Sequence, residues 1–270
     1  MRIYAIAVFL FLYVPIGIIV LFSFNAGRHA SELRGLSIQW YGKALSNPFV
    51  GDAFVTSLIV AFSVAILSSL MGTAAALALQ RLKGTPKILF DGLIYVSVMI
   101  PGIVIGIATL VALVTVFDFL NPLLASAWPE GSKPPKLHMG YASVIAAHTL
   151  FTMSLVIILV RARIAGMDRA LIEASMDLYA TPWRTFYQVT LPQIYPAILA
   201  GFLLSFTFSF DDFIISFFVA GANTTLPIYI FASIRRGITP EVNAIGTMVL
   251  VASLVLLLTA QFLLRKRTQR

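Results

Sequence analysis

Six long apolar segments constrain this chain more than any other feature of its sequence. Each has at least 20 residues, and about 20 helical residues are enough to cross the hydrocarbon core of a membrane. Backbone polar groups inside lipid must pair within their own segment, so each segment is predicted to be a helix. The sequence therefore predicts a single all-α integral membrane domain over residues 1–270. Its six predicted transmembrane helices are 3–23, 54–79, 92–117, 141–160, 197–220 and 242–264.

The composition supports a lipid environment and excludes several kinds of chemistry. Only 11% of the residues are charged, whereas a soluble domain has about 25%. The chain has no cysteine, which excludes disulfides and thiol catalysis. Its three histidines lack metal-ligand spacing, and it contains neither a phosphate-binding G-x-x-x-x-G-K-[ST] loop nor a G-x-S-x-G elbow. We expect a protein that is not an enzyme and holds no cofactor, with energy supplied by a partner or an ion gradient.

The distribution of lysine and arginine predicts the orientation of the helices. If the N-terminus is cytoplasmic, the inner segments hold 12 basic residues in 56 positions and the outer segments hold 7 in 74. Cytoplasmic loops carry the excess of basic residues in membrane proteins, so both termini are predicted to be cytoplasmic. This bias explains most of the net charge of +8 without a nucleic-acid partner. Segment 3–23 is longer than the apolar core of a signal peptide, so we interpret it as a retained helix, with a signal peptide as the alternative.

The longest inner segment, 161–196, contains a predicted short amphipathic helix over 168–180. Asp168 is a suitable N-cap residue, and Pro182 is expected to end the helix. Its apolar side chains recur with helical spacing at Leu171, Ala174 and Leu178. Such a helix must bury its apolar stripe against its own subunit, the membrane surface or another protein. The first two are the simpler interpretations, and a docking site for another protein is the more specific one.

The same segment carries a spaced motif that resembles a known signature. The matching residues are Glu173, Ala174, Ser175, Tyr179, Val189, Leu191 and Pro192. Their spacing resembles E-A-A-x3-G-x9-I-x-L-P, the cytoplasmic loop signature of permease subunits of bacterial ABC importers. Ser175 replaces the second alanine of the signature, and Tyr179 replaces its glycine, a residue that permits a tight turn. The resemblance implies that segment 168–192 couples the permease to an ATPase.

Further matches extend this resemblance over nearly the whole chain. The matching segments are Ser23-Phe24-Asn25, Trp40-Tyr41, Asp211-Asp212 and Thr239 to Ala244, and they resemble the permeases of spermidine/putrescine importers. The resemblance implies a bacterial inner-membrane protein that forms half of a translocation pathway. It implies as partners a second related permease, an external solute-binding protein, and two ATPase subunits that hold ATP and magnesium. The stretch Ser126 to His138 is longer than is usual in this family and is a candidate contact with the binding protein.

Asp211 and Asp212 are the only formal charges inside the six apolar segments. A carboxylate at the centre of a membrane costs about 2.5–3.5 kcal/mol on insertion scales, so it is expected to face a cavity or a partner. Along a regular helix, Asp212 shares a stripe with Ser209 and other small residues, whereas Asp211 lies on a different face. We therefore predict that Asp212 faces the pathway and that Asp211 is structural. The predicted site for an organic cation also includes the aromatic residues Phe208 and Phe210.

The alternative function, two further structural predictions and the range of substrates complete the predictions from the sequence. An ion-coupled secondary transporter with Asp211 and Asp212 as its ion site is the alternative function, although no two-half repeat supports it. His148 is predicted to make an interhelical hydrogen bond rather than relay protons, and Pro101-Gly102 is predicted to kink the third helix. The substrate is not fixed, because opines, amino-phosphonates and other amines place similar demands on the site.

Overall fold

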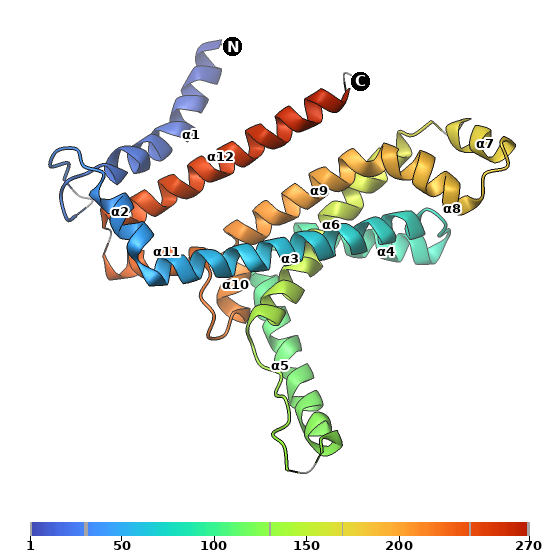
Figure 1. Cartoon of the computed structure of the whole chain (residues 1–270), viewed down its shortest axis with the longest axis horizontal. Coiled ribbons are helices and arrows are strands. Elements are labelled where there is room, and N and C mark those ends of the chain that lie inside the picture. The colour runs from blue at the N-terminus through green and yellow to red at the C-terminus, as the bar shows by residue number, and fades with distance from the viewer. Residues whose placement is uncertain (1, 30–31, 130, 169, 238, 269–270) are drawn as a thin grey trace. The chain divides into compact units, whose positions relative to one another are not determined.

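The computed structural model describes residues 2–29, 32–129, 131–168, 170–237 and 239–268 (Figure 1). The chain divides into two compact units. The first unit combines residues 1–53 with 228–270, and the second contains residues 54–227. Two helices, α3 (Pro48–Leu79) and α11 (Leu226–Arg236), cross the boundary between the units. The described residues form helices and loops, with one isolated β-bridge between Asn25 and Leu36.

The first unit is built on a pair of long helices. α1 (Arg2–Ser23) packs on α12 (Pro240–Thr268), and α12 also packs on α2 (Gln39–Ser46). Ile19 lies opposite Gly246 at the contact between α1 and α12. The side chain of Asn47 donates to the hydroxyl of Tyr229 at 3.1 Å and to Glu241 Oε1 at 3.0 Å, which ties the start of α3 to α11 and α12.

A buried asparagine organises the loop that follows α1. The Asn25 amide donates to the carbonyls of His29 and Glu32, and its Oδ1 accepts from the backbone N–H of Arg34 at 2.9 Å. The indole of Trp40 donates to the carbonyl of Asn25 at 2.8 Å. These hydrogen bonds explain why Asn25 and Trp40 occur at these positions, because each buried polar group needs a partner.

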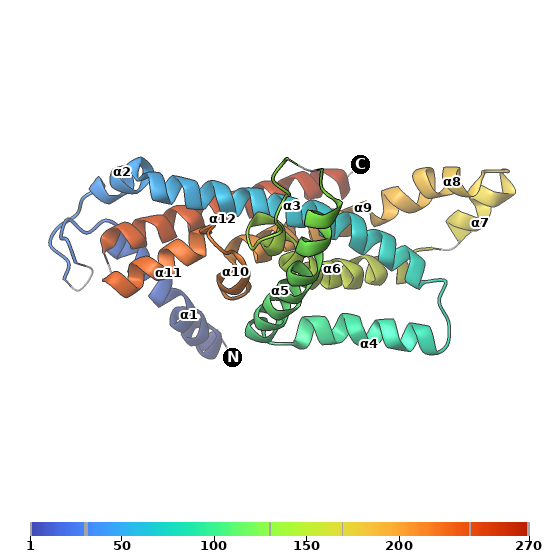
Figure 2. The ribbon, with the colours of Figure 1, turned by 90° about the horizontal axis from the view of Figure 1, so that it is seen from below.

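The second unit contains the remaining helices. They are α4 (Thr85–Met99), α5 (Gly102–Ala127), α6 (Tyr141–Ala165), α7 (Ala170–Asp177), α8 (Pro182–Thr185), a π-helical turn (Phe186–Thr190), α9 (Leu191–Asp211) and α10 (Ile214–Val219). α6 packs against α9 and α4, and α5 packs against α10. Figures 1 and 2 both place α7 and α8 at one end of α9 and α10 at the other.

The core of the second unit depends on close helix contacts at glycine. Val156 of α6 is fully buried and lies between Gly72 of α3 and Gly201 of α9. A Cβ atom on Gly72 would lie 2.8 Å from Val156 Cβ, and one on Gly201 would lie 3.2 Å from its methyl groups. Small residues are typical of such contacts in membranes, because they allow the backbones to approach closely.

The all-α membrane class is confirmed by the described helices. Five of them are long and apolar enough to cross a membrane: Tyr4–Ser23, Pro48–Leu79, Gly102–Ala127, Tyr141–Ala165 and Pro182–Asp211. The predicted sixth span, 242–264, lies in α12, whose apolar part is described over Pro240–Val255. Most of the side chains beyond Val255 lie outside the described set, so the sixth span stays a prediction.

Two segments that were predicted to be continuous helices are each interrupted in the structure. Segment 92–117 is interrupted at Ile100 and Pro101, which have extended ψ angles of 133° and 137°. Proline has no N–H and disfavours the helical region for the residue before it, so the predicted kink is a full break. Figure 1 shows α5 turning away from the direction of α4 after this break. Segment 197–220 is interrupted at Asp212, which has φ −71° and ψ 119° and separates α9 from α10.

Candidate functional site

The predicted short helix is present and shorter than expected. α7 has 8 residues, and Oδ1 of Asp168 accepts the backbone N–H of Ala170 at 2.9 Å, as expected for a capping side chain. The helix ends at Asp177, well before Pro182. The expected role of Pro182 is wrong: it lies at the first turn of α8, where its missing N–H has no cost.

The residues that depart from the importer signature have visible structural consequences. Ser175 and Thr185 share a hydrogen bond between their hydroxyl oxygens at 2.9 Å, which ties α7 to α8. Tyr179 has a φ of 57°, and it is the only non-glycine residue with positive φ among the described residues. This conformation is the one that glycine adopts without strain, so a tyrosine at this position costs conformational energy.

We expect Tyr179→Gly to be more stable than Tyr179→Ala by about 1 kcal/mol, because alanine keeps the strained φ whereas glycine relieves it. Both variants remove the ring, so their difference isolates the backbone effect. The measurement is the melting temperature of the purified protein in detergent. Equal melting temperatures would show that the turn relaxes to another conformation.

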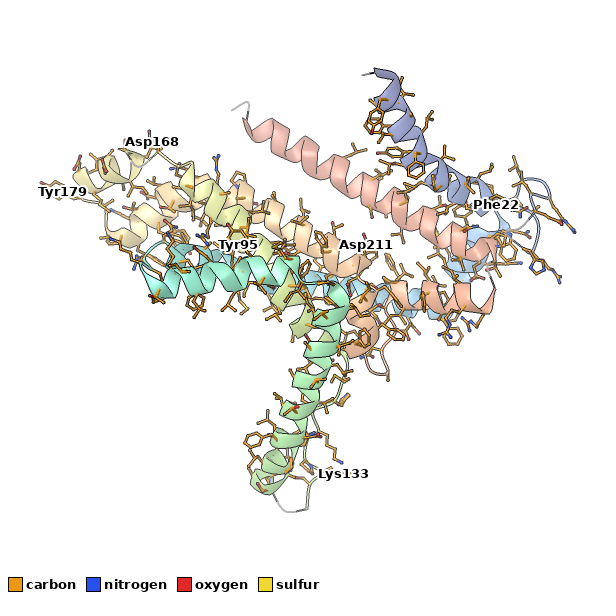
Figure 3. The ribbon with its side chains drawn as sticks, turned by 180° about the vertical axis from the view of Figure 1, so that it is seen from behind. Phe22, Tyr95, Lys133, Asp168, Tyr179 and Asp211 are labelled. Atoms are coloured by element: carbon orange, nitrogen blue, oxygen red, sulfur yellow. The ribbon has the colours of Figure 1, made fainter. Side chains whose placement is uncertain are left out.

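Exposed apolar side chains surround this turn. Tyr179 is 95% exposed and Leu178 is 82% exposed, and Figure 3 shows Tyr179 at the outer end of the unit. Trp183 is also exposed and stacks on Phe186 with ring centroids 5.8 Å apart. Tyr187 packs edge-on against Trp183 at 5.1 Å. Exposed apolar groups of this kind are typical of a surface that contacts another protein or the membrane.

The other signature residues divide between this surface and the core. Glu173 and Ala174 are exposed on α7, and Glu173 has no hydrogen bond or ion pair within the described part of the chain. Pro192 is exposed at the start of α9, whereas Leu191 packs against the buried core formed by α3, α4, α6 and α9. Some signature residues therefore form an exposed surface on α7, and others attach this segment to the helix bundle.

The second candidate site lies at the opposite end of α9, around the break at Asp212. The Oδ2 atom of Asp212 accepts the backbone N–H of Ser216 at 3.0 Å and lies 3.2 Å from Nε2 of His148. The other ring nitrogen of His148, Nδ1, lies 2.8 Å from Oγ of Ser209. Asp212 therefore has partners on both α6 and α10, and the predicted interhelical hydrogen bonding of His148 is observed.

The neighbouring carboxylate is in a different situation. Asp211, the last residue of α9 (Figure 3), is exposed, and it makes no hydrogen bond or ion pair with any described residue. The geometry thus opposes the predicted assignment of Asp212 to the pathway and Asp211 to structure. The stripe argument assumed a regular helix through both residues, whereas the helix ends between them.

The other predicted pathway residues do not form one exposed group. Phe208 is 46% exposed and packs edge-on against Phe151, with ring centroids 5.7 Å apart. Phe210 is buried and stacks on Phe206 at 5.9 Å. Ser209 is also buried, against His148. Only Phe208 shares the exposure of Asp211.

Sequence reasoning missed two arginine contacts on α6. Arg161 forms an ion pair with Asp91 of α4, and Arg163 donates to the carbonyl of Gln193 at 2.8 Å. These contacts join α6 to α4 and to the start of α9 beside α7. Opposite charges at the ends of two apolar segments were the available signal. Within the described residues, no group of His, Cys, Asp and Glu side chains could hold a metal ion.

Comparison with known proteins gives a consistent result. The family described as "Binding-protein-dependent transport system inner membrane component" matches residues 68–270. The chain is 35% identical over 248 residues to "Putrescine transport system permease protein PotI" of Escherichia coli strain K12, covering 90% of this chain and 83% of that protein. It is 33% identical over 260 residues to "Spermidine/putrescine transport system permease protein PotC" of Haemophilus influenzae, covering 96% and 94%.

Solved structures show a similar fold at lower sequence identity. A chain of a bacterial ABC transporter for the acidic polysaccharide alginate superposes with a TM-score of 0.76 at 17% identity, covering 98% of this chain and 94% of that one. A chain of an amino acid ABC transporter superposes with a TM-score of 0.57 at 18% identity, covering 86% and 100%.

Proposed function

This chain belongs to the family of inner membrane components of binding-protein-dependent transport systems, and from that premise we propose that it is a permease subunit for a polyamine or a similar small organic cation. The substrate class is supported by two curated relatives, which are named for putrescine and for spermidine with putrescine and align over nine-tenths or more of the chain. Its membership of a transport family makes it a transport component rather than an enzyme.

The carboxylate of Asp211 is the observation that best supports a cationic substrate. It is exposed at the end of α9 and has no partner among the described side chains. A carboxylate in a region of low dielectric attracts an ammonium group strongly. Phe208, also exposed, offers a ring face for the same cation.

The proposed assembly has four kinds of subunit. A second related permease completes the pathway, a solute-binding protein delivers the substrate from outside, and two ATPase subunits hold ATP and magnesium. We assign the docking of an ATPase to α7 and the exposed turn at Tyr179. ATP binding shifts the permease between its two states only if the ATPase contacts differ between those states.

Reconstituted uptake tests this function. Proteoliposomes that contain the chain with its partner subunits are expected to take up labelled putrescine when loaded binding protein and ATP are supplied. An imposed proton or sodium gradient without ATP is expected to drive no uptake. Uptake driven by the gradient alone would instead favour the ion-coupled secondary transporter, and uptake of an opine but not of putrescine would replace the substrate class.

A further inference from the structure

The break between α9 and α10 is held by one side chain from another helix. His148 of α6 is 2% exposed, and its ring contacts Ser209 in the last turn of α9. The opposite edge of the ring contacts Asp212 in the break at 3.2 Å and Oγ of Ser216 in α10 at 3.1 Å. We propose that His148 is a positioning residue, which fixes this break so that the carboxylate of Asp211 is presented to the transported cation. The proposal rests on the function proposed above.

The break needs such support because the helix that follows it, α10, is too short to be stable on its own. α10 has 6 residues, far fewer than an isolated helix needs for stability. The last carbonyls of α9 and the first N–H groups of α10 lack helical partners. Asp212 supplies an acceptor to the N–H of Ser216, but its own side chain is then fixed only if a second group holds it. His148 is that second group.

The hydrogen bonds at His148 are mutually consistent for a neutral imidazole. Nδ1 accepts from the hydroxyl of Ser209, and Nε2 carries the hydrogen, with Oγ of Ser216 at 3.1 Å as its hydrogen-bond partner and Oδ2 of Asp212 at 3.2 Å beside it. One tautomer therefore satisfies both edges of the ring. The hydroxyl of Ser216 lies on the Nε2 edge as well, so the ring links α9, the break and α10 together.

The contacts of His148 with Ser209, Asp212 and Ser216 determine the direction of the Asp211 carboxylate. Asp211 directly precedes Asp212, whose backbone is extended because the helix stops there. A regular helix would instead turn each residue by about 100° from the one before. Without these His148 contacts, the chain can continue as a helix or unwind at Asp212. Either change alters the direction of the Asp211 side chain although Asp211 itself is not replaced.

A positioning role differs measurably from a purely structural one. If His148 acts through Asp211, its replacement cannot reduce transport much further once the Asp211 charge is gone. If it only supports the fold, the two losses are independent and multiply. A double-mutant cycle separates these cases.

The experiment measures ATP-driven putrescine uptake per assembled complex in proteoliposomes, for His148→Leu, Asp211→Asn and the double variant. Each single change is expected to lower uptake about tenfold, and the double variant about tenfold as well rather than a hundredfold. His148→Gln, which retains an amide donor and acceptor, is expected to recover most of the uptake. If His148→Leu does not assemble, Ser209→Ala replaces it in the same cycle.

Ser68→Ala is the matched control, because it removes a buried hydrogen bond of 2.7 Å to Thr152, one turn after His148 on α6, without removing any contact of the His148 ring. It is expected to lower the melting temperature and to leave uptake per assembled complex unchanged. A hundredfold loss in the double variant, or normal uptake in His148→Leu, would overturn the positioning role alone. Normal uptake in Asp211→Asn would instead overturn the cation contact in the proposed function.

Discussion

Glu173→Lys is expected to abolish substrate uptake while the protein remains in the membrane. Glu173 is exposed on α7 and has no partner within the described residues, so its removal leaves no internal group unpaired. Reversing a charge at a docking surface replaces an attraction with a repulsion, and like charges that face each other in an interface cost several kcal/mol. The measurement is ATPase stimulation by loaded binding protein in proteoliposomes, together with uptake.

Two comparison variants make this result specific. Glu173→Gln removes the charge without reversing it and is expected to cause a smaller loss. Asp52→Lys makes the same reversal at an exposed position of α3, outside the docking segment, and is expected to retain uptake. Full stimulation and uptake in Glu173→Lys would contradict the docking role of α7.

The second large effect concerns the two adjacent carboxylates. Asp211→Asn is expected to lower uptake about tenfold, equivalent to about 1.4 kcal/mol, with little change in melting temperature. Asp212→Asn is expected to lower the stability of the complex by about 1–3 kcal/mol, because a neutral amide replaces the half-buried carboxylate that contacts His148 and accepts the N–H of Ser216. The measurements are labelled putrescine uptake and the melting temperature for each single variant.

Opposite results would restore the helical-stripe assignment. Uptake retained in Asp211→Asn and lost in Asp212→Asn, with unchanged stability in the latter, would place Asp212 in the pathway. The two substitutions have the same chemistry at neighbouring positions, so each serves as the control for the other.

The fold class could be predicted because it depends on the total hydrophobicity of long segments rather than on any single residue. Long apolar segments require helices whatever their packing, since lipid offers no partner to the backbone. The helix around Glu173 was likewise predictable, from its own apolar spacing and a capping residue. Even the strained turn at Tyr179 was indicated, because glycine is the signature residue there.

The two helix breaks show where sequence patterns stop being sufficient. Proline at 101 indicated a disturbance, but whether a proline kinks or ends a helix depends on the packing around it. At Asp212 no helix-breaking residue is present, and the break is held by His148, which lies 64 positions earlier in the chain. Such long-range partners cannot be read from local spacing, so the stripe through Asp212 assumed a continuous helix, and the role that it assigned to Asp212 stays a prediction.

The two breaks have a joint consequence, because α5 begins at one and α10 at the other. Gly106 of α5 allows Phe218 of α10 to approach so closely that a Cβ there would lie 2.8 Å from its ring, and Gly102 lies opposite Ile214. Each break leaves peptide groups that hydrocarbon cannot solvate, so they must meet protein or water. Because the starts of α5 and α10 are adjacent, the peptide groups that need protein or water as partners lie next to each other instead of being spread along the helices.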